Sequence, residues 1–336
     1  MAVEQKLIPL ESREEWREAL KGIKHTFGHS WENCYAMHLT TGLKTYLYSF
    51  EADDIRTICP FTEREFEGYI DIVKPYGFSG FVGNGRHPDF VRSWGEFVRD
   101  RGYVCGYLGL NPLFDYSNNF HADEIHQYGI VYILDLTPDA EDLLANMSRN
   151  RRRQLKKDWG TIRSNFVLEK SVLEKFFIEH YHDFLRKKNA SPVYFFSKET
   201  LSYLFRLDNV ILVGTHTAGK VTAVSVFSYT ADAGEYLFNV SLPEGRENSA
   251  ALVWYGINYL KSRHISSINL GGGSKGEFKR SFGSKVLPLR CLIEIYRQDI
   301  YDMLCHRMNV DPRNTGFFPA YRITDFKMQT QIVKTA

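Results

Sequence analysis

The chain has 336 residues, of which 43% are hydrophobic and 24% charged, a composition typical of a globular protein with room for two ordinary domains or one large one. Its formal net charge of +2 excludes a generally basic surface, so any anionic partner must be met by a local cluster of cations. The five cysteines are scattered and contain no CxxC pair, which argues against a disulfide framework and against a zinc site. The sequence shows neither a signal-like apolar run nor a membrane-spanning tract, and we expect a cytoplasmic protein.

The first third of the chain predicts helices, a hairpin and a mixed α/β unit. Ser12 and Glu15 have the spacing of a capping box, which predicts a helix to about Lys21. The elements expected after it are a helix around 29–39, a hairpin over 43–50 and 55–60, an extended run over 69–73, a loop over 75–80, a helix over 89–100 and a strand over 103–110. Glycine and aromatic residues in the loop indicate an irregular segment that borders a cleft.

A strand is expected over 125–136, and one long basic helix is expected to begin after Pro138. Helical spacing gives this helix an inward stripe of Leu144, Ser148, Arg151, Leu155 and Trp159, so Arg151 falls on the apolar side. The remaining cations point outward and would lie on a solvated face or on an anionic partner: Arg149, Arg152, Arg153, Lys156 and Lys157.

The rest of the chain repeats the order of the first third. Its expected elements are helices over 172–187 and 198–207, a hairpin over 210–215 and 220–229, a strand over 235–242, a loop over 243–249, a helix over 250–263 and a strand over 265–270. Trp94 with Leu110 matches Trp254 with Leu270 at a constant shift of 160 residues. This duplication predicts two similar α/β domains around a shared cleft.

We place the domain boundaries at residues 1–122 and 123–300. The second domain would end with a strand over 289–296, and residues 301–336 would form a C-terminal helix and a polar tail. A linker is expected near 119–124.

The segment from Gly271 to Lys285 carries the most chemistry. Its three consecutive glycines allow a sharp turn after the strand over 265–270. Beyond them the cations Lys275, Lys279, Arg280 and Lys285 alternate with Phe278 and Phe282. Such a segment can place an ammonium beside a developing oxyanion. A glycine turn followed by a solvated basic helix fits the same spacing.

Other catalytic patterns are weak or missing from the sequence. It contains no HExxH, GxSxG or P-loop pattern, which disfavours metal catalysis. The run from Arg246 to Ala251 approaches the RxxGxG/A pyrophosphate loop of acetyl-CoA-dependent acetyltransferases, with serine in place of glycine, and it equally fits an ordinary helix cap.

The run from Glu277 to Gly283 resembles the EFKxxFG segment of the FemAB family, the aminoacyl-tRNA-dependent peptidyltransferases built from two acetyltransferase-like (GNAT) domains. Arg149-Asn150 with Arg153 resembles the family's RNxxR helix, and the loop over 75–80 resembles the PYGYGG loop of its relatives. The run 110–113 is similar to their HPL segment, with Asn111 in place of histidine. The helix around 31–40 lacks the lysine with which members hold a sugar-nucleotide diphosphate. The resemblance implies a mixed α/β fold of two tandem GNAT-like domains.

The resemblance also implies transfer of an aminoacyl group from aminoacyl-tRNA to an amine of a small-molecule or peptide acceptor, with no cofactor or metal. Two alternatives remain open: an acyl-CoA-dependent N-acyltransferase, with acyl-CoA as co-substrate, and a non-catalytic binding module of the same fold. The expected catalytic residues are Lys279 and Phe278. The expected substrate-binding residues are Arg149, Arg151, Arg153, Tyr76, Asn111, Asn239, Arg246, Lys275 and Arg280.

Overall fold

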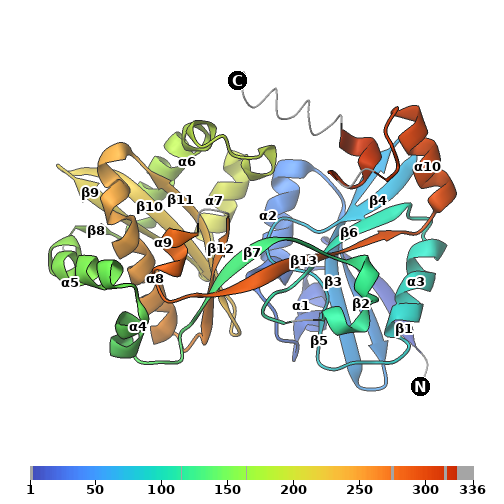
Figure 1. The fold of residues 1–336 in the computed structure, drawn as a ribbon, viewed down its shortest axis with the longest axis horizontal. Helices are drawn as coiled ribbons and strands as arrows, with labels where there is room; N and C mark the ends of the chain where they lie inside the picture. Colours follow the sequence, from blue (N-terminus) through green and yellow to red (C-terminus); the bar gives the residue numbers. More distant parts are fainter. Residues whose placement is uncertain (1–2, 115, 164, 274–275, 314–315, 324–336) are drawn as a thin grey trace. The chain divides into compact units, whose positions relative to one another are not determined.

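The computed structural model describes residues 3–114, 116–163, 165–273, 276–313 and 316–323 (Figure 1). The chain divides into two compact units. Unit 1 contains the residues up to Tyr128, the short segment Ser191–Tyr194 and the residues from Arg290 onward, whereas unit 2 contains Gly129–Ala190 and Phe195–Leu289. Unit 1 is therefore discontinuous in sequence.

Unit 1 is built on a sheet in the order β1-β2-β3-β4-β6-β13, in which β4 and β6 are parallel and the other neighbours antiparallel. Its strands are β1 (Glu4–Pro9), β2 (Thr45–Ala52), β3 (Ile55–Phe66), β4 (Tyr69–Val73), β5 (Val82–Gly83), β6 (Cys105–Leu110) and the end of β13 (Lys285–Ile295). Its helices are α1 (Arg13–Leu20), α2 (Trp31–Thr41), α3 (Phe90–Asp100) and α10 (Gln298–Arg307). Short 3₁₀ turns are η1 (Phe27–His29), η2 (Ser117–Asn119), η3 (Ala122–Glu124), η4 (Pro192–Tyr194) and η6 (Ala320–Arg322).

Unit 2 is built on a second series of strands in the order β7-β12-β11-β10-β9-β8, with β11 and β12 parallel. These strands are β7 (Ile125–Asp135), β8 (Phe166–Val167), β9 (Val210–Thr217), β10 (Lys220–Tyr229), β11 (Gly234–Ser241) and β12 (Ser267–Gly272). The helices of this unit are α4 (Ala140–Asn146), α5 (Arg149–Arg163), α6 (Lys170–Lys187), α7 (Lys198–Arg206), α8 (Ser249–Ser262) and the single turn α9 (Glu277–Arg280), with a 3₁₀ segment η5 (Pro243–Asn248).

The predicted α/β duplication is confirmed by the topology. In each unit an antiparallel hairpin leads to a strand, a helix and a second strand parallel to the first: β4-α3-β6 in unit 1 and β11-α8-β12 in unit 2. Trp94 of α3 and Trp254 of α8 are both buried against the core of their own unit. Gly256 lets α8 lie close to the sheet, because a Cβ there would come within 2.5 Å of the Phe227 ring.

The single long helix expected after Pro138 is wrong, because the chain breaks at Met147 and Ser148 into α4 and α5. Ser148 leaves the helical stripe and acts at the start of α5. Its Oγ accepts a hydrogen bond from the Arg151 backbone N–H (3.3 Å), and its own N–H donates to the Ser281 carbonyl (2.9 Å). The helix predicted from Ser12 is present as α1, but the Ser12 side chain makes no capping hydrogen bond.

The C-terminal part of the chain also differs from the prediction. Residues Arg290–Ile295 of β13 pair with β6 in unit 1 instead of closing a domain that ends at residue 300. Residues 316–323 are not a polar tail, because Tyr321 is buried and the Arg322 Nε lies 2.6 Å from Asp71 Oδ2. These residues complete the core of unit 1.

Two further observations bear on the chemistry. All five cysteines are buried and unpaired. A search of the described part of the chain finds no helix with the length and apolarity needed to cross a membrane.

Candidate functional site

The candidate site lies in unit 2, where β12 ends in a glycine turn. Gly271 and Gly273 have positive φ angles of 82° and 132°, which residues other than glycine rarely adopt. The Gly271 N–H donates to the Asn269 side-chain oxygen (2.7 Å), and a Cβ at Gly272 would lie 2.8 Å from the Ile130 carbonyl oxygen. The turn therefore needs glycine, and it leads the chain into α9. Lys275, expected in the site, lies outside the described residues.

The Lys279 side chain of α9 folds back over this turn. Its Nζ donates to the Gly272 carbonyl oxygen at 2.5 Å and lies 3.1 Å from the place a Cβ on Gly271 would occupy. The side chain is half-buried, and in the part of the chain that the structure describes no carboxylate lies within ion-pair distance of it. Loss of hydration by burial lowers the pKa of the Lys279 ammonium to about 8. Among the described residues, the Lys279 ammonium therefore has a neutral carbonyl oxygen as its hydrogen-bond partner.

Phe278 and Arg151 form the support of α9. The Phe278 ring packs edge-to-face on Phe282 at 5.4 Å between centroids, and Phe282 is fully buried in the core of unit 2. The Arg151 guanidinium carbon lies 4.7 Å from the Phe278 centroid and 4.8 Å from the Phe282 centroid, and its Nε donates to Ser281 Oγ (3.0 Å). Phe278 is thus part of the packing of α9, and Arg151 is half-buried, as its place on the predicted stripe indicated.

Most of the other cations predicted on this surface face solvent, but Arg152 is half-buried and its Nη1 donates to the Ala145 carbonyl oxygen (3.2 Å). Arg149, Arg153 and, on α9, Arg280 have exposed side chains, and among the described residues none of the three makes an ion pair. Lys156 and Lys157 are likewise exposed on α5. They can meet an anionic partner in the same unit that contains Lys279.

Asn239 and Arg246 lie elsewhere in unit 2. Asn239 is half-buried in β11, and the exposed Arg246 belongs to η5, the 3₁₀ segment that replaces the predicted loop. Gly245 of η5 packs tightly, since a Cβ there would lie 2.4 Å from the Thr222 carbonyl oxygen. Neither Asn239 nor Arg246 makes a described polar contact with Lys279.

Tyr76 and Asn111 belong to unit 1 and have mainly structural contacts there. The Tyr76 carbonyl oxygen accepts from Asn33 (2.9 Å), and its ring packs edge-to-face on Tyr194 (5.7 Å). Asn111 is 1% exposed. Its amide nitrogen donates to the Phe78 carbonyl oxygen (2.8 Å) and to Thr26 Oγ1 (3.1 Å). Its amide oxygen accepts two backbone N–H bonds, from residues 113 and 114.

Asn111 therefore holds the 75–80 loop in place, together with residues that the sequence did not single out. His29 lies under the loop, with Nε2 3.1 Å from the Gly80 carbonyl oxygen, and burial lowers its pKa to about 3. Gly80 is required, because a Cβ there would lie 1.9 Å from the Gly109 carbonyl oxygen. No local signal reveals these partners, which come from segments far apart in sequence.

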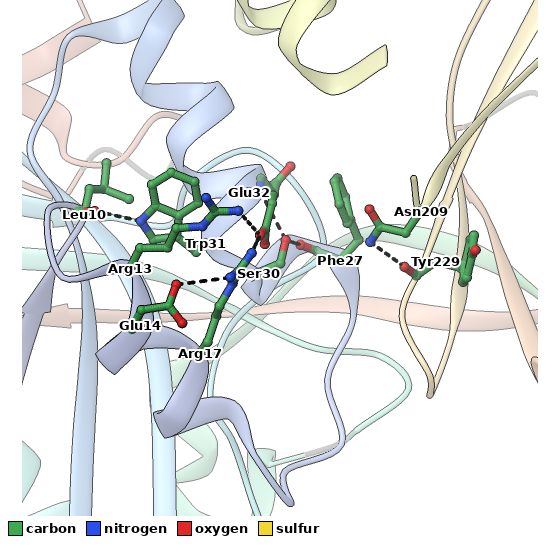
Figure 2. Close-up of polar contacts among 11 residues, drawn as sticks. Leu10, Arg13, Glu14, Arg17, Phe27, Ser30, Trp31, Glu32, Asn209 and Tyr229 are labelled. Atoms are coloured by element: carbon green, nitrogen blue, oxygen red, sulfur yellow. Dashed lines mark hydrogen bonds and ion pairs between the residues drawn. The ribbon is translucent and has the colours of Figure 1, made fainter. Parts of the chain in front are cut away.

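The start of α2 carries a different polar cluster (Figure 2). Glu32 accepts hydrogen bonds from Arg13 (3.3 Å) and Arg17 (2.8 Å), and the Arg13 guanidinium lies over the Trp31 ring at 4.5 Å. The two cations beside this helix are thus paired with Glu32, and Arg17 also with Glu14 (3.2 Å), and the helix itself has no lysine. Within the described ranges, no group of three or more metal-ligating side chains is placed to hold a metal ion.

The comparisons with known proteins support the fold. No protein-family model matches the chain, and no curated protein matches it significantly. A solved structure of FemX has a TM-score of 0.67 at 10% identity, with 89% of this chain and 99% of that chain covered. The C-terminal domain of a protein described as a lysylphosphatidylglycerol synthetase from Agrobacterium fabrum has a TM-score of 0.55 at 14% identity, with 88% and 96% covered. L-PGS from Bacillus licheniformis gives 0.53 at 12%, with 86% and 94% covered.

At identities this low, the structural likeness shows a shared fold and nothing more. This fold is the FemX-like, duplicated GNAT fold. The predicted FemAB-like fold class is confirmed by this likeness.

Proposed function

We propose that this protein is an acyltransferase that transfers an aminoacyl group from aminoacyl-tRNA to an amine of a small-molecule or peptide acceptor. The observation that carries the proposal is the Lys279 ammonium, half-buried over a glycine turn and bonded to a carbonyl oxygen rather than to a carboxylate. A buried cation without a counterion is costly in a stable fold, so its presence indicates a site for negative charge. The FemX-like fold, shared with a protein described as a lysylphosphatidylglycerol synthetase, supports aminoacyl transfer.

In this reaction the acceptor amine attacks the ester carbonyl of the donor. The carbonyl oxygen gains negative charge, and the tetrahedral intermediate then collapses. The amide bond forms, the bond to the ribose oxygen breaks, and the amine proton is lost to that oxygen or to solvent. Lys279 donates to the oxyanion as the negative charge develops, which lowers the barrier more than it improves donor binding. No covalent intermediate with the protein is needed.

The donor's phosphates would be held by exposed cations of unit 2: Arg149, Arg153, Lys156, Lys157 and Arg280. Because Arg151 joins α5 to α9, these cations and Lys279 belong to one packed substructure. A ligand that binds along α5 is therefore brought close to the Lys279 segment.

A second candidate is an acyl-CoA-dependent N-acyltransferase. The observation that favours it is the N-terminus of α8, where Asn248 gives no side-chain cap and instead donates to Thr215 Oγ1 (3.3 Å). Its backbone N–H groups and the exposed Arg246 could hold a pyrophosphate. A protein of this fold that only binds is the third candidate.

Donor binding separates the three. We expect fluorescent aminoacyl-tRNA to bind with an affinity that falls steeply with salt. Replacing Arg149, Arg153, Lys156 and Lys157 by glutamine should flatten this dependence by roughly 0.7–0.9 in log–log slope for each lost phosphate contact. A matched control replaces four exposed lysines in or next to α6 and α7 by glutamine: Lys175, Lys187, Lys188 and Lys198.

The alternatives give different results in the same assay. Salt-insensitive tRNA binding, together with acyl-CoA binding that Arg246→Ala weakens, would establish the CoA-dependent reaction instead. Tight binding of a donor without turnover in the presence of varied amines would leave the binding module.

A further inference from the structure

We propose that Arg151 is a positioning residue: lodged against Phe278 and Phe282, it holds α9 on α5 and so keeps the Lys279 amine over the glycine turn. Its catalytic consequence rests on the proposed function, but the positioning itself can be tested without any turnover.

The first step is the set of contacts that Arg151 makes. Its guanidinium carbon is within 4.8 Å of both ring centroids, and its Nε donates to Ser281 Oγ at 3.0 Å. Its Nη1 donates to Gln154 Oε1 (2.5 Å), and Gln154 in turn donates to the Glu247 carbonyl oxygen (3.3 Å). None of these groups is a carboxylate, so Arg151 is a buried cation used for packing and for hydrogen bonds to neutral oxygens.

The second step is that α9 cannot hold itself. It is a single turn of four residues, and a helix of that length has no intrinsic stability. Its connections to α5 are the two rings beside Arg151, the Arg151–Ser281 bond and the Ser148 N–H that donates to the Ser281 carbonyl (2.9 Å). Arg151 takes part in two of these connections, so its loss removes the side-chain hydrogen bond and the cation–π contacts that join α5 to this segment.

The contacts of the Arg151 guanidinium indicate positioning and not substrate binding. The sequence suggested Arg151 as a substrate ligand, but its guanidinium lies against two rings and two of its nitrogens are already hydrogen-bonded within unit 2. Arg153, two residues along the same helix, is exposed. The two arginines therefore differ in position: Arg153 faces solvent, where a ligand can reach it, and Arg151 faces α9.

The position of α9 has a measurable consequence at the Lys279 amine. Burial lowers the pKa of this amine to about 8, so release of α9 into solvent should return the pKa toward the ordinary lysine value of about 10.4. The experiment is competitive labelling of lysines with acetic anhydride over a pH series, with the Lys279 peptide quantified by mass spectrometry. We expect a labelling midpoint near pH 8 in the wild type and a rise of at least about one pH unit in Arg151→Met.

The matched control is Arg153→Met, which should leave the Lys279 midpoint unchanged. Arg151→Lys keeps a charge but loses the planar contact with the rings, and should give an intermediate midpoint. If Arg151→Met fails to fold by circular dichroism, Ser281→Ala removes the acceptor of the Nε bond, together with the hydrogen bond that Ser281 Oγ donates to the Phe278 carbonyl oxygen (2.6 Å), and should shift the midpoint in the same direction.

Turnover supplies the second readout. Where the wild type transfers an acyl group, Arg151→Met should lower kcat at least about tenfold with donor affinity nearly unchanged, whereas Arg153→Met should weaken donor affinity. An unchanged Lys279 midpoint in both Arg151→Met and Ser281→Ala would overturn the proposal, whatever the activity. A shifted midpoint in a protein without transferase activity would uphold the positioning and count against the proposed function alone.

Discussion

The two units treat a buried charge in opposite ways. In unit 1, Asp71 is 1% exposed and fully compensated: Arg64 lies 2.6 Å from one carboxylate oxygen, and Arg322 and the Tyr321 hydroxyl lie 2.6 and 2.9 Å from the other. In unit 2, Lys279 has a backbone carbonyl as its hydrogen-bond acceptor. The compensated charge of Asp71 belongs to the architecture, whereas we propose that the Lys279 ammonium receives negative charge during function.

The ends of the equivalent strands show the same difference. After β6, both the amide nitrogen and the amide oxygen of Asn111 are hydrogen-bonded within unit 1. After β12, three glycines and α9 leave a half-buried ammonium at the turn. The two copies of one fold thus differ at this strand end: in one the polar side chain is used up by hydrogen bonds within the unit, and in the other an ammonium is left on a backbone carbonyl oxygen.

Asp71→Asn should give the largest effect. The substitution leaves two buried guanidinium groups with a neutral partner, and we expect the free energy of unfolding to fall by about 3–5 kcal/mol, measured by urea denaturation. The control is Glu67→Gln, which breaks the exposed pair with Arg307 and should cost less than about 1 kcal/mol. Equal losses of unfolding free energy in the two variants would show that the buried Asp71 cluster stabilises unit 1 no more than an exposed ion pair does.

Lys279→Met should give the largest effect on chemistry. Loss of one oxyanion donor typically costs about 3–4 kcal/mol of transition-state stabilisation, or roughly 100- to 1000-fold in turnover. The reacting form is the ammonium, so wild-type kcat should fall as pH rises through about 8, and this limb should be missing in the variant. Turnover of Lys279→Met within about threefold of wild type at neutral pH would make Lys279 a structural residue.

Asn111→Ala should affect stability without affecting chemistry. It leaves two backbone N–H groups without their buried partner and the Phe78 carbonyl oxygen with Thr26 Oγ1 as its remaining donor, and we expect a loss of about 2–3 kcal/mol in unfolding free energy. The folded fraction should keep its kcat. A large fall in kcat with unchanged stability would instead return Asn111 to the substrate-binding residues.

The smallest expected effect is an increase in the free energy of unfolding, whereas most substitutions lower it. Because the folded-state pKa of Lys279 is lowered, the folded protein binds fewer protons than the unfolded chain between about pH 8 and 10.4, and stability rises with pH over that range. Below it, the cost of burying the ammonium is fully present. Lys279→Met should therefore stabilise the protein by about 1–2 kcal/mol at neutral pH, with a smaller gain above about pH 10. Thermal unfolding at the two pH values checks this, and a destabilised variant would show that Lys279 serves the fold.

The sequence was informative where the signal was local. The glycine turn and the hairpin that turns at Ala218-Gly219 could both be predicted, because special φ angles and strand alternation leave marks in neighbouring residues. The stripe that placed Arg151 on an apolar face was correct for the same reason. Its partners were not predictable, since Ser281 lies 130 residues further along the chain.

The errors come from contacts between distant segments. Ser148 breaks the predicted helix although neither glycine nor proline marks the break, because its N–H bonds to Ser281. The tail was predicted to be polar although residues 316–322 read GFFPAYR, and the sequence could not show that Arg322 pairs with Asp71, which lies 251 residues earlier. The alternation in β13 predicted a strand but could not show that its partner is β6 of unit 1.

The discontinuity of unit 1 has a consequence for biosynthesis. During translation β6 emerges early, but the strand that covers one of its edges is not made until the whole of unit 2 has left the ribosome. Unit 2 is continuous except for four residues, whereas unit 1 waits for β13 with an open strand edge and with Asp71 lacking Arg322. A nascent chain that stops before β13 therefore leaves β6 of unit 1 with an unpaired edge. Chaperones and proteases recognise such an edge, so truncated chains are removed.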